Sequence, residues 1–163
     1  SATTELGTMQ RIESLLKETG VNALLVLAFI NGIMIIGRAF AGSIVIKIKT
    51  TGMLFLSSVF AFAGLQLLAN SSGSFVFISA AFFAIGVTFF WPTTLAFISE
   101  NIPESGAFGM SLIGGLGMLS VSLVLPLMGR FLDNSIGAEV IQKMSILPFV
   151  LIFLYGGLYL RKR

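Results

Sequence analysis

An uncharged stretch, residues 75–98, runs through the middle of the sequence with Pro92 inside it. As a helix, this stretch is long enough to cross a hydrocarbon core of about 30 Å. Proline has no N–H, so the carbonyl of Thr88 loses its helical partner. In lipid this loss is costly unless the carbonyl is buried in protein or lines a polar cavity. We therefore expect a broken membrane helix.

Trp91, the only tryptophan of the chain, lies next to this weak point. Tryptophan is usually enriched at membrane interfaces, not inside a span. At 3.6 residues per turn, Thr88 and Trp91 share one face of the helix with Leu95 and Ile98. A hydroxyl and a large aromatic side chain on one face suggest the wall of a ligand path. The alternative is a proline kink packed against neighbouring helices, with Trp91 as filler.

The composition indicates an integral membrane protein. Of 163 residues, 56% are hydrophobic and 10% are charged, too few charges for a soluble domain of this size. The sequence contains no cysteine and no histidine, which removes disulfides and the usual zinc and haem ligands. A net charge of +3 gives no support for nucleic-acid binding. The lipid bilayer is therefore the first partner that we expect.

Apolar runs separated by polar or basic segments predict one all-α membrane domain. We expect five spans, at residues 21–40, 52–69, 75–98, 107–128 and 144–160. Residues 1–16 are too polar to span alone, but their apolar side chains follow helical spacing. They form either an interfacial amphipathic helix or the last turns of a further membrane helix. The many small residues of 107–128 predict a close-packing helix.

Basic residues near the ends of the spans predict the orientation. Six would lie on the side of the C-terminus, Arg38, Lys47, Lys49, Arg161, Lys162 and Arg163, and four on the other, Arg11, Lys17, Arg130 and Lys143. Because the cytoplasmic side carries the excess of basic residues, we expect a cytoplasmic C-terminus.

The sequence shows no catalytic or metal-binding pattern. Its serines have no histidine with which to form a Ser–His pair. The spacing of its carboxylates matches no metal motif. We therefore expect no enzyme activity, no metal and no cofactor.

Three stretches, in order, resemble the major facilitator superfamily. Residues 37–52 (GRAFAGSIVIKIKTTG) resemble the short basic loop between the eighth and ninth helices. Residues 89–109 (FFWPTTLAFISENIPESGAFG) resemble the tenth helix and the following loop of sugar porters and fucose-permease-like members. Residues 4–16 (TELGTMQRIESLL) resemble the outer end of the seventh helix. The resemblance implies a C-terminal half-bundle, from late helix seven (1–16) to helix twelve (144–160).

The resemblance implies a secondary active transporter in a bacterial inner membrane. Such a protein would move a small organic solute, for example a sugar, by alternating access with proton coupling. This chain departs from the family pattern because it has no N-terminal six-helix half. Alternating access requires two bundles that rock around a central site, so we expect the missing half as a partner.

We expect the substrate to meet Glu5, Gln10, Asn31, Thr88 and Trp91. Trp91 would stack on an apolar ring face, and Gln10 and Asn31 would hydrogen-bond hydroxyls. Glu5 is the only candidate charge on the outer path. The alternative for Gln10 and Asn31 is hydrogen bonding between helices.

Arg38 and Glu100 are expected to form a gating pair. Each lies near the end of a predicted span, and both spans run in the same direction. A charge near a membrane core is costly, so a partner is expected, and the planar arginine fork suits a carboxylate. In sugar porters, a similar arginine–glutamate cluster latches the inner helix ends in the outward-facing state. The alternative is that both side chains reach into water and headgroups.

A different class also fits the composition: a small, non-transporting membrane subunit or assembly factor that packs against a larger complex. The gene would separate the two. A transporter half predicts an open reading frame that continues upstream of Ser1 with about six more spans. A small subunit predicts a methionine at or just before Ser1.

Overall fold

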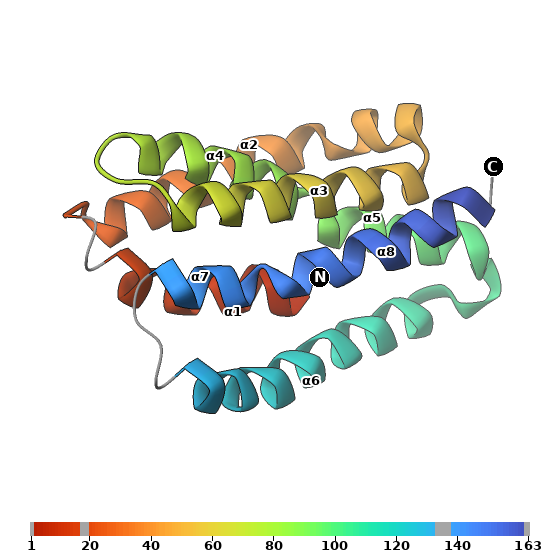
Figure 1. Cartoon of the computed structure of the whole chain (residues 1–163). Helices are drawn as coiled ribbons and strands as arrows, with labels where there is room; N and C mark the ends of the chain where they lie inside the picture. Colours follow the sequence, from red (N-terminus) through yellow and green to blue (C-terminus); the bar gives the residue numbers. More distant parts are fainter. Residues whose placement is uncertain (1, 17–19, 133–137, 162–163) are drawn as a thin grey trace.

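The computed structural model of the chain describes residues 2–16, 20–132 and 138–161. Within these ranges every regular element is a helix, as expected for an all-α protein. The elements are α1 (Ala2–Leu16), α2 (Ala23–Ile48), α3 (Thr50–Ala69), α4 (Phe75–Thr88), α5 (Phe90–Asn101), η1 (Pro103–Ser105), α6 (Gly106–Leu132), α7 (Ala138–Met144) and α8 (Ile146–Arg161). Figure 1 shows them as roughly parallel rods.

Five helical segments of the described residues are long and apolar enough to cross a membrane. They are Ala23–Ile44, Thr50–Ala69, Phe75–Asn101, Pro103–Leu127 and Glu139–Arg161. The protein is therefore an integral membrane protein, and the prediction of five spans is confirmed.

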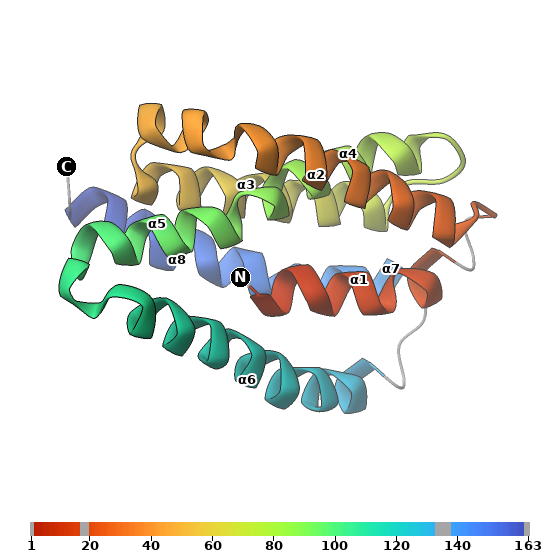
Figure 2. The same cartoon turned by 180° about the vertical axis from the view of Figure 1, so that it is seen from behind.

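The helices form a layered bundle. In Figures 1 and 2, α2, α3 and α4 form an upper layer, and α1, α7 and α8 lie beneath it. Helix α6 runs along the bottom of the bundle, on the side away from α2, α3 and α4. Helix α3 is central, because it packs against α4, α5, α7 and α8. Helix α6 makes its main contact with α1.

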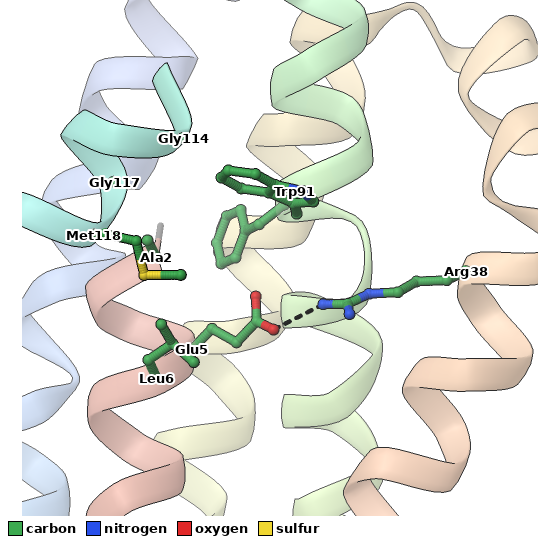
Figure 3. Close-up of a pocket in the computed structure, with 9 residues that line it drawn as sticks. Ala2, Glu5, Leu6, Arg38, Trp91, Gly114, Gly117 and Met118 are labelled. Atoms are coloured by element: carbon green, nitrogen blue, oxygen red, sulfur yellow. Dashed lines mark hydrogen bonds and ion pairs between the residues drawn. The ribbon is translucent and has the colours of Figure 1, made fainter. Parts of the chain in front are cut away.

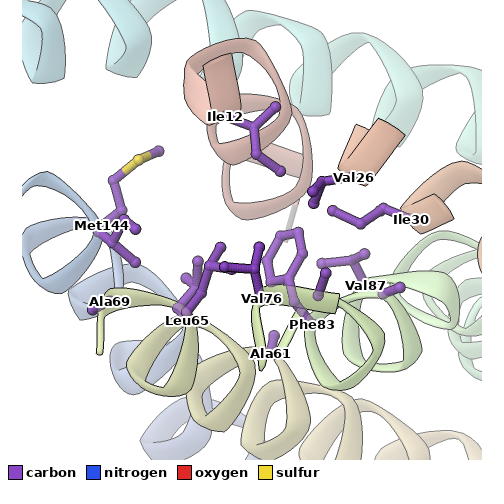
Figure 4. Packing of buried hydrophobic residues seen from close by; sticks show 14 of the residues in the cluster. Ile12, Val26, Ile30, Ala61, Leu65, Ala69, Val76, Phe83, Val87 and Met144 are labelled. Carbon is purple, nitrogen blue, oxygen red and sulfur yellow. The ribbon is translucent and has the colours of Figure 1, made fainter. Parts of the chain in front are cut away.

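Helix α1 packs inside the bundle and not on its surface. Its Ile12 and Leu16 are buried in the main apolar core, together with Val26 and Ile30 of α2. Figure 4 shows Ile12 facing these residues across the core. The alternative of a surface amphipathic helix is therefore wrong for the described residues of this segment.

Two glycines bring α3 and α4 into close contact. A Cβ atom added at Gly64 of α3 would overlap the backbone of Phe83 of α4. In the reciprocal position, a Cβ atom added at Gly86 of α4 would overlap the backbone of Ala61 of α3. The two backbones therefore approach as closely as small residues allow in a membrane.

The predicted close-packing helix, residues 107–128, corresponds to α6, which packs only loosely within the described residues, so its close packing stays a prediction. Only 6% of the most apolar stretch of the span Pro103–Leu127, which contains most of α6, is buried in the bundle. Gly115 has nothing within 4 Å of an added Cβ atom. The small residues of α6 would allow another helix to approach closely, but no helix backbone lies against them among the described residues. The closest backbone contact described above is instead between α3 and α4.

The expected break in the third span is confirmed. Helix α4 ends at Thr88 and α5 begins at Phe90, with Phe89 between them at φ −93° and ψ −7°. Pro92 is the cause, because its ring clashes with the Thr88 carbonyl and removes the hydrogen bond to it. The last span repeats this relation, since Ser145 separates α7 from α8 three residues before Pro148.

The first span is longer than expected. The span was predicted to end at residue 40, but its helix, α2, continues to Ile48 through residues 41–48 (AGSIVIKI), which contain no proline. It ends at Lys49, whose φ of 62° is left-handed and ends regular α-helix. This difference matters for the depth of Arg38.

Candidate functional site

The starts of α1 and α5 and the middle parts of α2 and α6 surround a cavity of about 160 Å³. Figure 3 shows the cavity in close-up. It is lined by Ala2, Glu5, Leu6, Arg38, Phe90, Trp91, Gly114, Gly117 and Met118. Its lining is therefore mostly apolar, with two charged side chains.

The two charged side chains are paired. The Nη2 atom of Arg38 donates a hydrogen bond of 2.7 Å to Oε1 of Glu5. The side chain of Arg38 is 42% exposed, whereas that of Glu5 is 13% exposed. Arginine suits this pair because its delocalised, weakly hydrated charge tolerates partial burial.

The pair lies deep in the bundle. Arg38 is ten residues before Ile48, about 15 Å along the helix axis at 1.5 Å per residue. From Ala23 the same rise gives about 22 Å, so Arg38 lies near the middle of α2. The part of α2 that can cross a membrane is Ala23–Ile44, so Arg38 lies inside it, about 9 Å from its end. Ionisable groups inside membrane-spanning segments are rare and need partners.

Trp91 lies over two glycines of α6. Cβ atoms added at Gly114 and Gly117 would each lie 3.7 Å from the indole ring. The two glycines therefore leave a flat surface against which the ring rests. Phe90 beside it is buried, whereas Trp91 is 39% exposed, so one side of the indole remains free beside the cavity.

The structure brings Glu5, Arg38 and Trp91 together, but not the other expected substrate residues. Thr88 is buried, donates a hydrogen bond to the Ala84 carbonyl and lies against Gly37. Its hydroxyl is therefore used inside its own helix.

Asn31 and Gln10 add nothing to the described cavity. Asn31 is exposed on α2, and its Nδ2 donates a hydrogen bond of 2.8 Å to the Leu27 carbonyl, within its own helix. Gln10 belongs to α1, but its side chain lies outside the described residues.

The expected contact between Arg38 and Glu100 is not formed in this structure. Arg38 pairs with Glu5, and Glu100 accepts a hydrogen bond of 2.8 Å from the Thr50 hydroxyl. The reason is depth. Because α2 continues to Ile48, Arg38 lies about 15 Å below the end of the bundle at which Glu100 meets Thr50.

Sequence reasoning missed part of the cavity wall. Leu6 and Met118 carry no chemical signal, since apolar side chains in a membrane helix usually face lipid or core. The glycine spacing of α6 did indicate a surface for a close contact, because Gly114 and Gly117 lie on the same face of the helix. It was interpreted as a helix contact, whereas it accommodates Trp91.

A second cavity, of about 180 Å³, lies among α2, α3 and α4 and is almost entirely apolar. Ser57 is its only hydroxyl-bearing wall residue, and its Oγ is buried without a hydrogen-bond partner. Its neighbour Ser58 donates to the Leu54 carbonyl. The second cavity therefore lacks the paired charges and the tryptophan of the first.

The first cavity combines a cation, a carboxylate and an aromatic face at the depth of the membrane-spanning helices. Together these groups can hold a small polar ligand and respond to its charge. The chemistry comes from the residues alone, because no family model matches the chain and no curated protein or solved structure matches it.

Proposed function

We propose that the chain is one half of a secondary active transporter that moves a small organic solute across the membrane by alternating access. The observation that supports this most is the Glu5–Arg38 pair, which borders the cavity beside Trp91. Ionisable groups inside membrane proteins mark substrate and ion pathways. Helices that only fill a bundle have no need for such a pair.

The same pair supports proton coupling. Protonation of Glu5 would remove the charge that neutralises Arg38, and an unpaired charge at this depth is strongly unfavourable. The site therefore has two states of different charge, and a solute that binds one of them better would be transported with a proton.

The broken span supports a role in transport as well. Discontinuous membrane helices near the bilayer midplane form the binding sites of many transporters. Here the break at Phe89 lies two residues from Trp91. In this proposal α1 is the end of helix seven, α2 to α8 form helices eight to twelve, and the C-terminus faces the cytoplasm of a bacterium.

The partner of this bundle would be a second six-helix half, as in the major facilitator superfamily. The gene tests this directly. We expect an upstream reading frame that continues from Ser1 through about six further spans. A start codon at or just before Ser1 would contradict the proposal and favour a small membrane subunit.

Transport by the complete protein is the second test. Proteoliposomes with an inward proton gradient should accumulate the solute, and Glu5→Gln should abolish accumulation while leaving downhill exchange. Accumulation that is unchanged in Glu5→Gln would contradict proton coupling through this pair.

A further inference from the structure

We propose that the cavity beside Trp91 binds an organic carboxylate, and that the carboxylate competes with Glu5 for Arg38. This inference rests on the proposed transport function and names the class of its substrate. It follows from the number of hydrogen-bond donors and acceptors in the cavity wall, from the exposure of Arg38 and from the size of the cavity.

The side chains around the cavity offer many donors and few acceptors. Arginine carries five N–H donors, and the structure uses one of those of Arg38 in its bond to Glu5. The Trp91 indole adds one donor and no acceptor. Apart from the weakly accepting sulfur of Met118, the side-chain acceptor in the wall is the carboxylate of Glu5, one oxygen of which already binds Arg38.

This excess of hydrogen-bond donors over acceptors in the cavity wall favours binding of an anion over binding of a polyol. Each hydroxyl of a sugar is both donor and acceptor, so a bound sugar needs acceptors from the protein as well as donors. A donor left without a partner in a buried site weakens binding. A carboxylate only accepts hydrogen bonds, and the arginine fork can hold it with two of them.

The positive charge is also the more accessible one. Arg38 exposes 42% of its side chain and Glu5 only 13%. In Figure 3, Arg38 reaches Glu5 from α2, and Trp91 of α5 lies near the pair. Of the two charged side chains, the guanidinium is therefore the less buried one for an anion to contact.

The cavity limits the rest of the ligand. Its volume of about 160 Å³ is close to the roughly 150 Å³ of an engineered apolar cavity that holds benzene. Apart from Trp91, the wall away from the charges is apolar or glycine, with Leu6, Phe90 and Met118 as the large side chains. The part of the ligand that this wall holds is therefore a carboxylate with a compact apolar body, such as a single ring.

Trp91 makes the test specific, because it is the only tryptophan of the chain and lines this cavity. The 163-residue chain would be reconstituted in nanodiscs and titrated at pH 7 while tryptophan fluorescence is recorded. The probes are cyclohexanecarboxylate, its neutral analogue cyclohexanecarboxamide, and methyl glucoside as a polyol.

We expect cyclohexanecarboxylate to shift the fluorescence and to bind at least about tenfold more tightly than the carboxamide, because a charge-assisted hydrogen bond is the stronger one. Glu5→Gln should tighten carboxylate binding, since it removes the competitor. Arg38→Gln should abolish the preference for the carboxylate. The exposed Arg130 at the end of α6 provides the control, and Arg130→Gln should leave all three titrations unchanged.

Arg38→Gln leaves Glu5 without its partner and could unfold the chain. The double variant Glu5→Gln/Arg38→Gln removes both charges, so it keeps the site neutral, and it should fold yet show no preference for the carboxylate. Equal affinities for carboxylate and carboxamide in the unmodified chain, or no shift with any probe, would overturn the inference.

Failure of this inference differs from failure of the proposed function. Binding of methyl glucoside without binding of the carboxylate would show that the substrate class is wrong, while a solute site remains. A start codon at Ser1 would contradict the transporter itself, whichever probe binds.

Discussion

Glu5 and Arg38 form a 2.7 Å ion pair that joins the first turn of α1 to the middle of α2. The contact spans 33 residues of sequence. It ties α1 to α2 at the same end of α1 that borders the cavity. The pair is therefore a structural link as well as the charged part of the site.

The pair should couple energetically. Glu5→Gln and Arg38→Gln should each lower the free energy of unfolding, because each leaves one charge without its partner. The double variant should lose less than the sum, with a coupling of about 1–3 kcal/mol. Unfolding by denaturant in a defined detergent measures all three. Strictly additive losses would show that the pair contributes nothing.

Glu100 should couple to Thr50 and not to Arg38. Thr50→Val and Glu100→Gln remove the two ends of one hydrogen bond, so their effects on the melting temperature should be less than additive. Arg38→Gln and Glu100→Gln should be additive within about 0.5 kcal/mol, as for distant sites. Strong coupling of Arg38 to Glu100 would favour the gating pair expected from the sequence.

The contact between α3 and α4 should not tolerate a single added methyl group. Gly64→Ala and Gly86→Ala place a Cβ atom against the backbone of the opposite helix, so each should lower stability by about 1–3 kcal/mol or more. Gly115→Ala on α6 is the matched control, since nothing lies within 4 Å of its added Cβ atom. Thermal unfolding in detergent separates the two outcomes. A loss at Gly115 as large as that at Gly64 would contradict this packing.

Removal of the unpartnered hydroxyl should stabilise the protein. Ser57 is buried, and its Oγ has no hydrogen-bond partner among the described residues, so Ser57→Ala should raise the free energy of unfolding by about 1 kcal/mol. Ser58 is equally buried, but its hydroxyl donates to the Leu54 carbonyl. Ser58→Ala should therefore gain less than Ser57→Ala, and the reverse order would show that Ser57 has a partner.

Trp91 should matter for transport and not for folding. In the complete transporter, Trp91→Ala should lower uptake about tenfold, the equivalent of 1.4 kcal/mol of lost binding. The fraction of folded protein on size exclusion should stay the same. Phe108→Ala, at a side chain of α6 that is 76% exposed, is the control. Equal losses in the two variants would remove Trp91 from the site.

The spans and the break were predictable because their causes are local. Apolar length alone places five helices in a membrane. The interruption near Thr88 follows from the missing N–H of Pro92, whatever the helix packs against. The same chemistry applies at Pro148, where the sequence analysis expected an unbroken span and the structure has a break at Ser145.

The partner of Arg38 was not predictable because it depends on depth and on tertiary packing. The sequence placed the end of the helix at residue 40, and α2 ends eight residues later at Ile48. With the helix predicted to end at residue 40, Arg38 was expected at its end, at the same depth as Glu100, whereas in the structure it lies near the middle of α2. The glycines of α6 show a related limit, since small residues indicate that something can approach but not what, and here Trp91 lies against Gly114 and Gly117.

Because the helix is interrupted at Phe89, a tilt of α5 about this point would move its two ends by different amounts. At 1.5 Å per residue, Trp91 lies about 3 Å from the pivot and Glu100 about 16 Å from it. A tilt of about 10° therefore carries Glu100 by roughly 3 Å and Trp91 by roughly half an ångström. The hydrogen bond between Thr50 and Glu100 therefore holds the part of α5 that such a tilt would displace most, whereas Trp91 lies close to the break.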